Sequence, residues 1–182
     1  MIRTLLSNGA FLVIAAGLTG VSAASAADAP AVGSPAPAVS LTSGEGQTVN
    51  LNDYRGKWVV LYFYPKDFTG GCTLEAHNFQ ADLAKYEKAG AVILGVSVDT
   101  AQSHKDFCAK EGLRFKLLSD PDAKVSAEYG SMMEYEGARM SARNTFLIDP
   151  QGKIARVFLK VKPATHSEEV LAALAELQQK KS

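Results

Sequence analysis

The stretch Trp58–Phe79, WVVLYFYPKDFTGGCTLEAHNF, decides how this chain folds. It begins with seven consecutive apolar or aromatic residues, 58–64, and Pro65 ends the run. Such a run, bounded by a breaker, is typical of a buried strand in the middle of a sheet. A short loop with two glycines then leads to Cys72, after which apolar residues recur at helical intervals. The stretch therefore predicts a strand, a loop and a helix, with Cys72 at or near the helix N-terminus.

This predicted position leaves two interpretations of Cys72. Open α/β sheets keep their active sites at the carboxyl ends of the strands. A helix N-terminus carries partial positive charge and unpaired N–H groups, and these stabilise a thiolate, the nucleophilic form of cysteine. Thr69, three residues earlier, has a hydroxyl that can point to the same place. The alternative is that Cys72 is one half of a structural disulfide, and position alone does not decide between the two.

The composition limits the class of protein and its partners. A length of 182 residues is enough for one domain with an extension, and an apolar content of 47% is ordinary for a globular protein. Basic and acidic residues number 19 each, so bulk charge gives no reason to expect nucleic acid or a membrane surface as a partner. Two cysteines are too few for a disulfide scaffold and lack the spacing of zinc ligands. We expect no metal and no cofactor.

Residues 1–26 have the pattern of a signal peptide that is removed on export. Arg3 is their only charged side chain, and the apolar run over 10–21 is too short for a stable membrane span. Residues 24–26 read Ala-Ser-Ala, which is a small-residue cleavage site. An uncleaved N-terminal anchor is the alternative. We predict a Sec-type signal peptide, a periplasmic or secreted mature protein, and no stable membrane insertion after cleavage.

The remaining chain is predicted to be an extended lead-in over 27–38, rich in Ala, Pro and Gly, followed by one domain over 39–180. The predicted strands are two within 39–51, around a Gly-Glu-Gly turn, and one each at 58–64, 92–98, 115–118, 144–148 and 154–160. The predicted helices run from Cys72 to about Gly90, from a cap at Thr100 to Gly112, over part of 119–129, and over about 165–178. Residues 130–142 are predicted to be loop. This order predicts an α/β domain with a thioredoxin-like fold, in which helices flank a mixed central sheet.

Residues 65–72, Pro-Lys-Asp-Phe-Thr-Gly-Gly-Cys, fit the P-x-x-x-T-x-x-C pattern of peroxiredoxins. Together with Tyr-Phe-Tyr before it and Thr-Leu-Glu-Ala after it, the stretch resembles the Q-type branch, also called bacterioferritin comigratory protein. The resemblance covers about 33–174, nearly the whole mature chain. There are two departures. Gly70 stands where the branch usually has proline, and His77 stands where many members carry a resolving cysteine.

The resemblance implies a thiol-dependent peroxidase that reduces hydrogen peroxide and organic (alkyl) hydroperoxides. It makes Cys72 the peroxidatic nucleophile, and it gives Pro65 the roles of shielding the thiolate and holding the loop. The Thr69 hydroxyl and the backbone N–H groups of Gly71 and Cys72 are the predicted donors to the departing oxygen. Donors aimed at that oxygen lower the barrier more than donors that only bind the substrate.

Arg143 is the predicted guanidinium of this site, because it matches the R-x-T-F pattern of the family at the start of a predicted strand. Arginine suits the role since it stays charged and offers several fixed donors. On spacing alone, Arg143 would be read as a surface residue, and Arg139 is a neighbour without such a match. Glu75 falls in the first predicted helical turn, where it complements the helix dipole. The resemblance gives it a minor role in holding the site.

Cys108 lies 36 residues after Cys72, on the next predicted helix. Free cysteines are often buried, so one interpretation is an inert thiol in a peroxidase that uses a single cysteine. The resemblance favours a resolving cysteine, because some Q-type members place it on this later helix. It then implies a Cys72 sulfenic acid, an intramolecular Cys72–Cys108 disulfide, recycling by a thioredoxin-like dithiol donor, and a monomer. We expect the two Cα atoms to lie farther apart than the ~7 Å that a disulfide allows, so that helical segments must unwind first.

The three histidines, His77, His104 and His166, receive no catalytic role, and His104 is expected on an exposed helix face. Two functions of other kinds stay open. One is an exported thiol–disulfide oxidoreductase, although Cys72 is not followed by the second cysteine of a C-x-x-C motif. The other is a thioredoxin-fold binding module whose two cysteines form a static disulfide.

Overall fold

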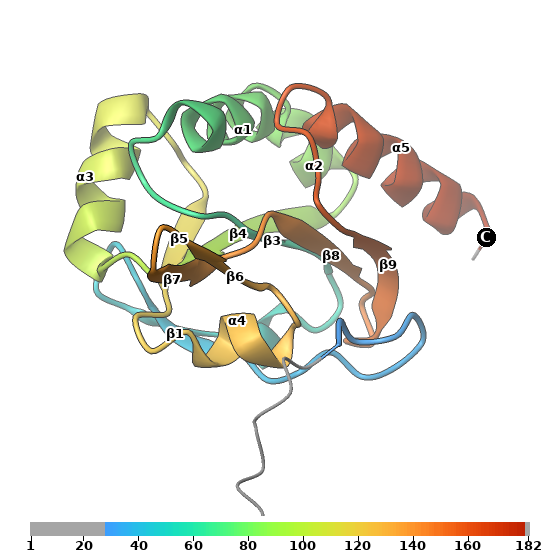
Figure 1. The fold of residues 1–182 in the computed structure, drawn as a ribbon. Coiled ribbons are helices and arrows are strands. Elements are labelled where there is room, and N and C mark those ends of the chain that lie inside the picture. The colour runs from blue at the N-terminus through green and yellow to red at the C-terminus, as the bar shows by residue number, and fades with distance from the viewer. Residues whose placement is uncertain (1–27, 181–182) are drawn as a thin grey trace, which may run out of the picture.

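A computed structural model describes residues 28–180, so the predicted signal peptide lies outside the described residues. Its centre is one seven-stranded mixed sheet in the order β2-β1-β5-β4-β3-β8-β9, with helices on both faces (Figure 1). The strands of this sheet are β1 (Ser40–Ser43), β2 (Thr48–Asn50), β3 (Trp58–Phe63), β4 (Ala91–Ser97), β5 (Lys116–Ser119), β8 (Asn144–Ile148) and β9 (Ile154–Phe158). The helices are η1 (Leu51–Tyr54), α1 (Gly70–Ala81), α2 (Leu83–Lys88), α3 (Ala101–Glu111), α4 (Lys124–Glu128) and α5 (His166–Gln179). The predicted α/β class, with a mixed sheet between helices, is confirmed.

β3 is the central strand, and all six of its residues are buried. It pairs in parallel with β4 and antiparallel with β8. Val60 and Tyr62 belong to the apolar cluster on one face of the sheet, and Val59 and Leu61 belong to the cluster on the other. A strand that is covered on both faces needs apolar residues at every position, which is why 58–63 shows no polar alternation.

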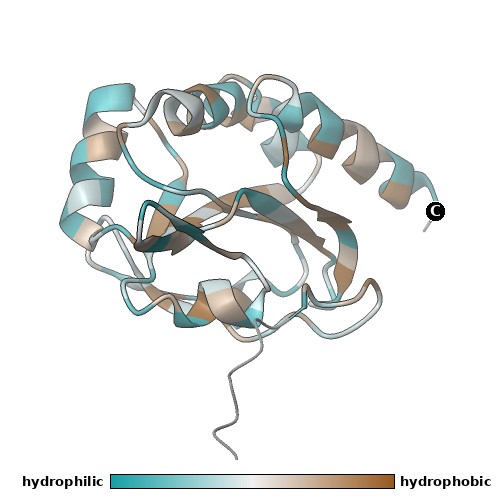
Figure 2. Cartoon of the chain, viewed as in Figure 1, coloured by the Kyte–Doolittle hydropathy of each residue, from teal (hydrophilic) through white to brown (hydrophobic). Residues whose placement is uncertain are grey.

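The two faces of the sheet are covered by different parts of the chain. The first cluster includes side chains of α1, α2, α3 and α5, together with Cys72, and Cys108 packs against it. The second cluster includes residues of β2, η1 and α4 and contains neither cysteine. Figure 1 shows α4 on the face opposite to α1, α2, α3 and α5, and Figure 2 shows hydrophobic colour on the central strands. The chemistry of the two thiols therefore belongs to one side of the sheet.

Residues 130–142 were predicted to be loop, and this prediction is wrong. They contain β6 (Met132–Tyr135) and β7 (Ala138–Ser141), which form a separate two-stranded antiparallel sheet. The turn between them has positive φ at both of its residues, 51° at Glu136 and 77° at Gly137, as a type I′ hairpin turn requires. Most residues of the two strands are exposed or half-buried. Each strand has only four residues and no continuous apolar run, so the sequence carries little signal for a strand here.

The single helix predicted from Cys72 to Gly90 is divided into α1 and α2 at Asp82. Asp82 has φ −92° and ψ 0°, outside the ordinary helical values. Its carboxylate accepts hydrogen bonds of 2.7 Å from Ser167 Oγ and Lys85 Nζ, and the Tyr86 hydroxyl donates to the Ser167 carbonyl at 2.8 Å. The bonds to Ser167 come from the start of α5. The division is thus held by a tertiary contact that the local pattern does not contain.

α3 begins and ends as predicted. Thr100 is its N-cap, and the Thr100 hydroxyl oxygen accepts a hydrogen bond of 3.2 Å from the Ser103 N–H. Gly112 ends the helix with φ 67°, the left-handed conformation that glycine adopts readily. Within residues 28–180, no helix combines the length and the apolar character needed to cross a membrane.

Candidate active site

Cys72 lies in the first turn of α1, after the loop that follows β3. Thr69 is the N-cap and the cysteine is the third residue of the helix, which confirms the prediction of Cys72 at or near a helix N-terminus. Its side chain is buried, with an exposed fraction of 2%. The orientation of α1 directs unpaired N–H groups and partial positive charge towards this region, which favours the anionic form of a thiol.

Arg143 reaches Cys72 because β8 runs antiparallel to β3. In this register Asn144, the first residue of β8, stands opposite Phe63, the last residue of β3. The residue before β8 therefore falls beside the loop that carries the cysteine. Arg143 Nη2 lies 3.3 Å from Cys72 Sγ and donates a hydrogen bond to it. The structure thus brings together two predicted residues that are 71 positions apart.

Glu75 holds the other side of this guanidinium. Arg143 Nη1 donates to Glu75 Oε2, and only 1% of the Glu75 side chain is exposed. Burial raises the pKa of Glu75 to about 7, although the nearby Arg143 acts in the opposite direction. Burial would lower the pKa of Arg143, but the charges of Glu75 and Cys72 raise it above its usual value. The guanidinium therefore stays charged between a carboxyl group and a sulfur atom.

Gly71 leaves the space that the guanidinium occupies. A Cβ atom at this position would lie 3.3 Å from Arg143 Nη2 and 3.8 Å from Cγ of Pro163. The first of these distances is shorter than an ordinary van der Waals contact. A side chain at position 71 would therefore press on the nitrogen that contacts Cys72.

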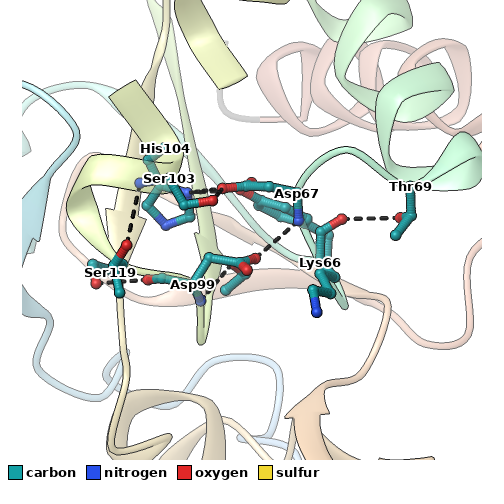
Figure 3. Close-up of polar contacts among 10 residues, drawn as sticks. Lys66, Asp67, Thr69, Asp99, Ser103, His104 and Ser119 are labelled. Carbon is teal, nitrogen blue, oxygen red and sulfur yellow. Dashed lines mark hydrogen bonds and ion pairs between the residues drawn. The ribbon is translucent and has the colours of Figure 1, made fainter. Parts of the chain in front are cut away.

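Thr69 and Pro65 are placed in the loop before the helix. The Thr69 hydroxyl donates a hydrogen bond of 2.9 Å to the Lys66 carbonyl, as Figure 3 shows. It makes no side-chain cap bond to α1. Pro65 is half-buried and follows Tyr64 at the end of the central strand. In this conformation the Thr69 hydroxyl proton stabilises the loop and is not directed at the sulfur.

Cys108 lies on α3, and both cysteines are free. Burial, together with the charges of Asp67 and Glu45, raises the pKa of the Cys108 thiol to about 11. The thiol is therefore protonated at neutral pH, and a protonated thiol is a poor nucleophile. It also lines a pocket of about 200 Å³ beside Lys105 and Phe115.

Four buried or half-buried residues form a polar cluster that sequence reasoning missed. We call it the Asp67 cluster, and its members are Tyr64, Asp67, Ser103 and His104. Asp67 accepts hydrogen bonds of 2.7 Å from the Tyr64 and Ser103 hydroxyls, and its Oδ2 lies 2.9 Å from His104 Nδ1. Burial raises the pKa of Asp67, but the contacts with His104, Tyr64 and Ser103 outweigh that effect and lower it below the usual value.

His104 was expected on an exposed helix face, and this expectation is wrong, because none of its side chain is exposed. Its partner Asp67 comes from a loop 37 positions earlier, so no local pattern reveals the pair. Two features of the sequence could have indicated a buried, paired histidine. Phe107 lies three residues further along the helix, on the same side, and Asp67 is an acidic residue in the glycine-containing loop.

The other two histidines lie in different surroundings. His77 is exposed on α1, and its Nε2 lies 2.9 Å from Glu111 Oε2 at the end of α3. His166 is buried at the start of α5, with Nε2 at 2.8 Å from Thr145 Oγ1. Burial lowers the pKa of His166 to about 4, so the ring is neutral at physiological pH. Among residues 28–180 there is no group of three or more His, Cys, Asp or Glu side chains that could hold a metal ion.

Comparisons of sequence and structure relate this chain to known proteins. Residues 32–157 match the AhpC/TSA family. A putative peroxiredoxin bcp of Coxiella burnetii is 44% identical over 150 residues, which cover 79% of this chain and 97% of that protein. Peroxiredoxin Bcp of Xanthomonas campestris is 44% identical over 138 residues, which cover 74% of this chain and 86% of that protein. The solved structure of Xanthomonas campestris peroxiredoxin Q superposes with a TM-score of 0.72 at 42% identity, covering 76% of this chain and 90% of the other.

Proposed function

Because this chain belongs to the AhpC/TSA family and is a peroxiredoxin related to the Q-type, or bacterioferritin comigratory, branch, we propose that Cys72 is its peroxidatic nucleophile and Cys108 its resolving thiol. The observation that carries the proposal is the contact of 3.3 Å between Arg143 Nη2 and Cys72 Sγ. A guanidinium fixed beside a buried sulfur stabilises the thiolate and the charge that develops on the oxygen in front of it.

In the first step the Cys72 thiolate attacks one oxygen of a peroxide along the O–O axis. An S–O bond forms and the O–O bond breaks. The sulfur loses two electrons, and the departing oxygen leaves as water or an alcohol after it takes up a proton. Arg143 and the N–H groups of the Gly71–Cys72 turn donate to the departing oxygen. Thr69 joins them once its hydroxyl turns from the Lys66 carbonyl, and Pro65 shields the thiolate from water.

In the second step the Cys108 thiolate attacks the sulfur of the Cys72 sulfenic acid. An S–S bond forms, the S–O bond breaks, and the hydroxide leaves as water with one proton. Cys108 first has to lose its proton, and burial in α3 opposes this. Movement of α3 that exposes Cys108 to water removes this obstacle and brings the two sulfurs together.

In the third step a thioredoxin-like dithiol reduces the disulfide by thiol–disulfide exchange. The predicted signal peptide supports a location in the periplasm or outside the cell, and the intramolecular disulfide supports a monomer. Organic hydroperoxides are included as substrates because a bacterioferritin comigratory protein of Xanthomonas campestris, 41% identical to this chain, has been described in terms of alkyl peroxide reduction.

The test combines rapid mixing with peroxide and intact mass after alkylation. Cys72→Ser should lose the rapid reaction, whereas Cys108→Ser should consume one equivalent of peroxide and accumulate the sulfenic acid. Arg143→Lys should slow the oxidation of Cys72 by about a hundredfold, because a lysine cannot contact both Glu75 and the sulfur. Arg139→Lys, on the exposed part of β7, is the matched control and should react like the wild type.

Two results would contradict parts of the proposal. Rapid peroxide reduction by Cys72→Ser would remove Cys72 from the reaction altogether. A wild-type protein that reacts with peroxide but forms no Cys72–Cys108 disulfide would make Cys108 an inert thiol. The raised pKa of the half-buried Cys108 thiol favours that second candidate, a peroxidase that uses only one cysteine of its own.

A further inference from the structure

The Asp67 cluster joins the loop before α1 to the first turns of α3. Figure 3 shows Asp67 between Ser103 and His104 of α3 on one side and Lys66 and Thr69 of the loop on the other. Asp67 and His104 are both almost fully buried, with side-chain exposures of 1% and 0%. The backbone N–H of Asp67 also donates to Asp99 Oδ2 at 2.9 Å, which fixes the loop to the end of β4. Hydrogen bonds to a buried carboxylate are among the stronger polar contacts in proteins.

Further contacts fasten the rest of α3 to the segment that carries Cys72. The ring of Phe68, in the loop, packs edge to face on Phe107 with 5.1 Å between the ring centroids. At the far end of the helix, Glu111 pairs with His77 of α1 at 2.9 Å. Both side chains of the Asp67–His104 pair are buried, whereas each of the other two contacts has one exposed partner, Phe68 or His77.

Cys108 lies one helical turn after His104, since four residues bring a helical side chain back to the same face. The thiol therefore cannot move towards Cys72 while this turn of α3 stays bound to the loop, unless the helix breaks between the two residues. Any contact that is present in the closed state and lost before the transition state slows the opening.

We propose that Asp67 and His104 are positioning residues that set the rate of the resolving step, because their contact must part before Cys108 reaches Cys72. This inference rests on the proposed Cys72–Cys108 disulfide. It predicts that weaker contacts in the Asp67 cluster speed disulfide formation and leave the first oxidation of Cys72 unchanged. Disulfide formation also competes with a second oxidation, in which another peroxide molecule converts the sulfenic acid to sulfinic acid. The cluster therefore sets the peroxide concentration at which the enzyme is inactivated.

The experiment measures the lifetime of the Cys72 sulfenic acid and the peroxide concentration that converts half of the protein to sulfinic acid, both by rapid quenching and intact mass. Asp67→Asn removes the charge, and we expect the sulfenic acid to decay about tenfold faster, which corresponds to about 1.4 kcal/mol on the barrier. The half-inactivating peroxide concentration should rise by the same factor. Ser103→Ala removes one hydroxyl bond and should act in the same direction with a smaller effect.

Two further variants separate this role from a general loss of stability. His104→Asn keeps an N–H donor at the place of Nδ1. This variant should form the disulfide at close to the wild-type rate, and therefore more slowly than Asp67→Asn. Gln102 lies on the same helix, and among residues 28–180 its side chain hydrogen-bonds to Asp106 of that helix alone, so Gln102→Ala should resolve at the wild-type rate. If Asp67→Asn and Ser103→Ala resolve at the wild-type rate, the helix breaks after His104 and the proposal is wrong.

The same substitutions in a Cys108→Ser background decide where the effect arises. Without a resolving thiol, Asp67→Asn should form sulfinic acid at the same rate as its Cys108→Ser parent. A difference in that background would mean that the cluster acts on Cys72 directly, which would overturn the proposal. A wild-type protein that forms no disulfide would instead contradict the proposed function, so the two failures can be told apart.

Discussion

Glu75 is buried beside the only guanidinium that contacts Cys72 among the described residues, and its own ionisation lies close to physiological pH. Oε2 accepts a hydrogen bond from Arg143, whereas Oε1 is buried and has no hydrogen-bond partner in the described part of the chain. A charged Glu75 holds Arg143 by charge as well as by hydrogen bonding. A protonated Glu75 loses the charge, so the position of Arg143 depends on pH.

The first prediction concerns this dependence. Burial raises the pKa of Glu75 to about 7, so the carboxyl takes up its proton as pH falls through 7 and the hold on Arg143 weakens. We expect the rate of Cys72 oxidation to fall below pH 7 in the wild type. Glu75→Gln, which is neutral at every pH, should lack this step in a stopped-flow pH profile.

The comparison of the two profiles isolates the contribution of Glu75 to the pH dependence. Glu134→Gln, at an exposed site on β6, is the matched control and should keep the wild-type profile. Superimposable profiles for the wild type and Glu75→Gln would contradict the assignment.

At the scale of residues, the sequence predicted the pair that forms the centre of the site and missed the cluster beside it. Cys72 and Arg143 could be found because each begins or precedes an element and each fits a short motif. Asp67 and His104 could not be paired, because each is ordinary in its own segment and only the packing of α3 on the loop makes them neighbours. The orientation of the Thr69 hydroxyl depends equally on the detailed path of the loop.

At the scale of elements, α3 connects the loop, the second thiol and the sheet. Its N-terminus is fixed by the Thr100 side chain, which accepts from the Ser103 N–H. α5 also starts after a threonine, Thr165, but that side chain makes no cap bond to the helix backbone. The two helices therefore offer an internal comparison of capped and uncapped starts.

The second prediction uses this comparison. Thr100→Ala should lower the free energy of unfolding by about 1 kcal/mol, the usual cost of a lost N-cap bond. Thr165→Ala should have a clearly smaller effect. Urea titration followed by circular dichroism measures both, and equal losses in the two variants would show that the Thr100 bond contributes nothing.

The elements that the sequence predicted best are those buried on one or both faces. β3 could be predicted because burial on both faces demands an unbroken apolar run. The β6–β7 hairpin was missed because it forms its own small sheet with most residues exposed or half-buried. The division between α1 and α2 depends on Ser167 of α5, which lies 85 positions away from Asp82.

At the scale of the whole molecule, the sheet separates a side that carries both thiols from a side that carries neither. The cluster with α1, α2, α3 and α5 includes Cys72 and contacts Cys108. The cluster with α4 includes Val125, Tyr129 and Phe146 and no cysteine. A rearrangement that joins the thiols therefore has to disturb only one layer of the molecule.

The third prediction follows from this separation. In the disulfide form, amide hydrogen exchange should speed up in α3 and in the first turn of α1, where the two cysteines lie. Exchange in β3, β8 and α4 should stay at the rate of the reduced protein. Mass spectrometry of peptides from both forms provides the measurement, and faster exchange throughout the sheet would contradict a change confined to one side.

The antiparallel pairing of β8 with β3 also determines when, during folding, Arg143 reaches Cys72. The guanidinium that contacts Cys72 comes 71 positions later in the chain, just before β8. Until β8 pairs with β3, the cysteine and this guanidinium have no fixed position relative to each other. On the proposed mechanism, peroxide reactivity is acquired only once β8 has joined the sheet, because an unfolded chain does not hold Arg143 beside Cys72.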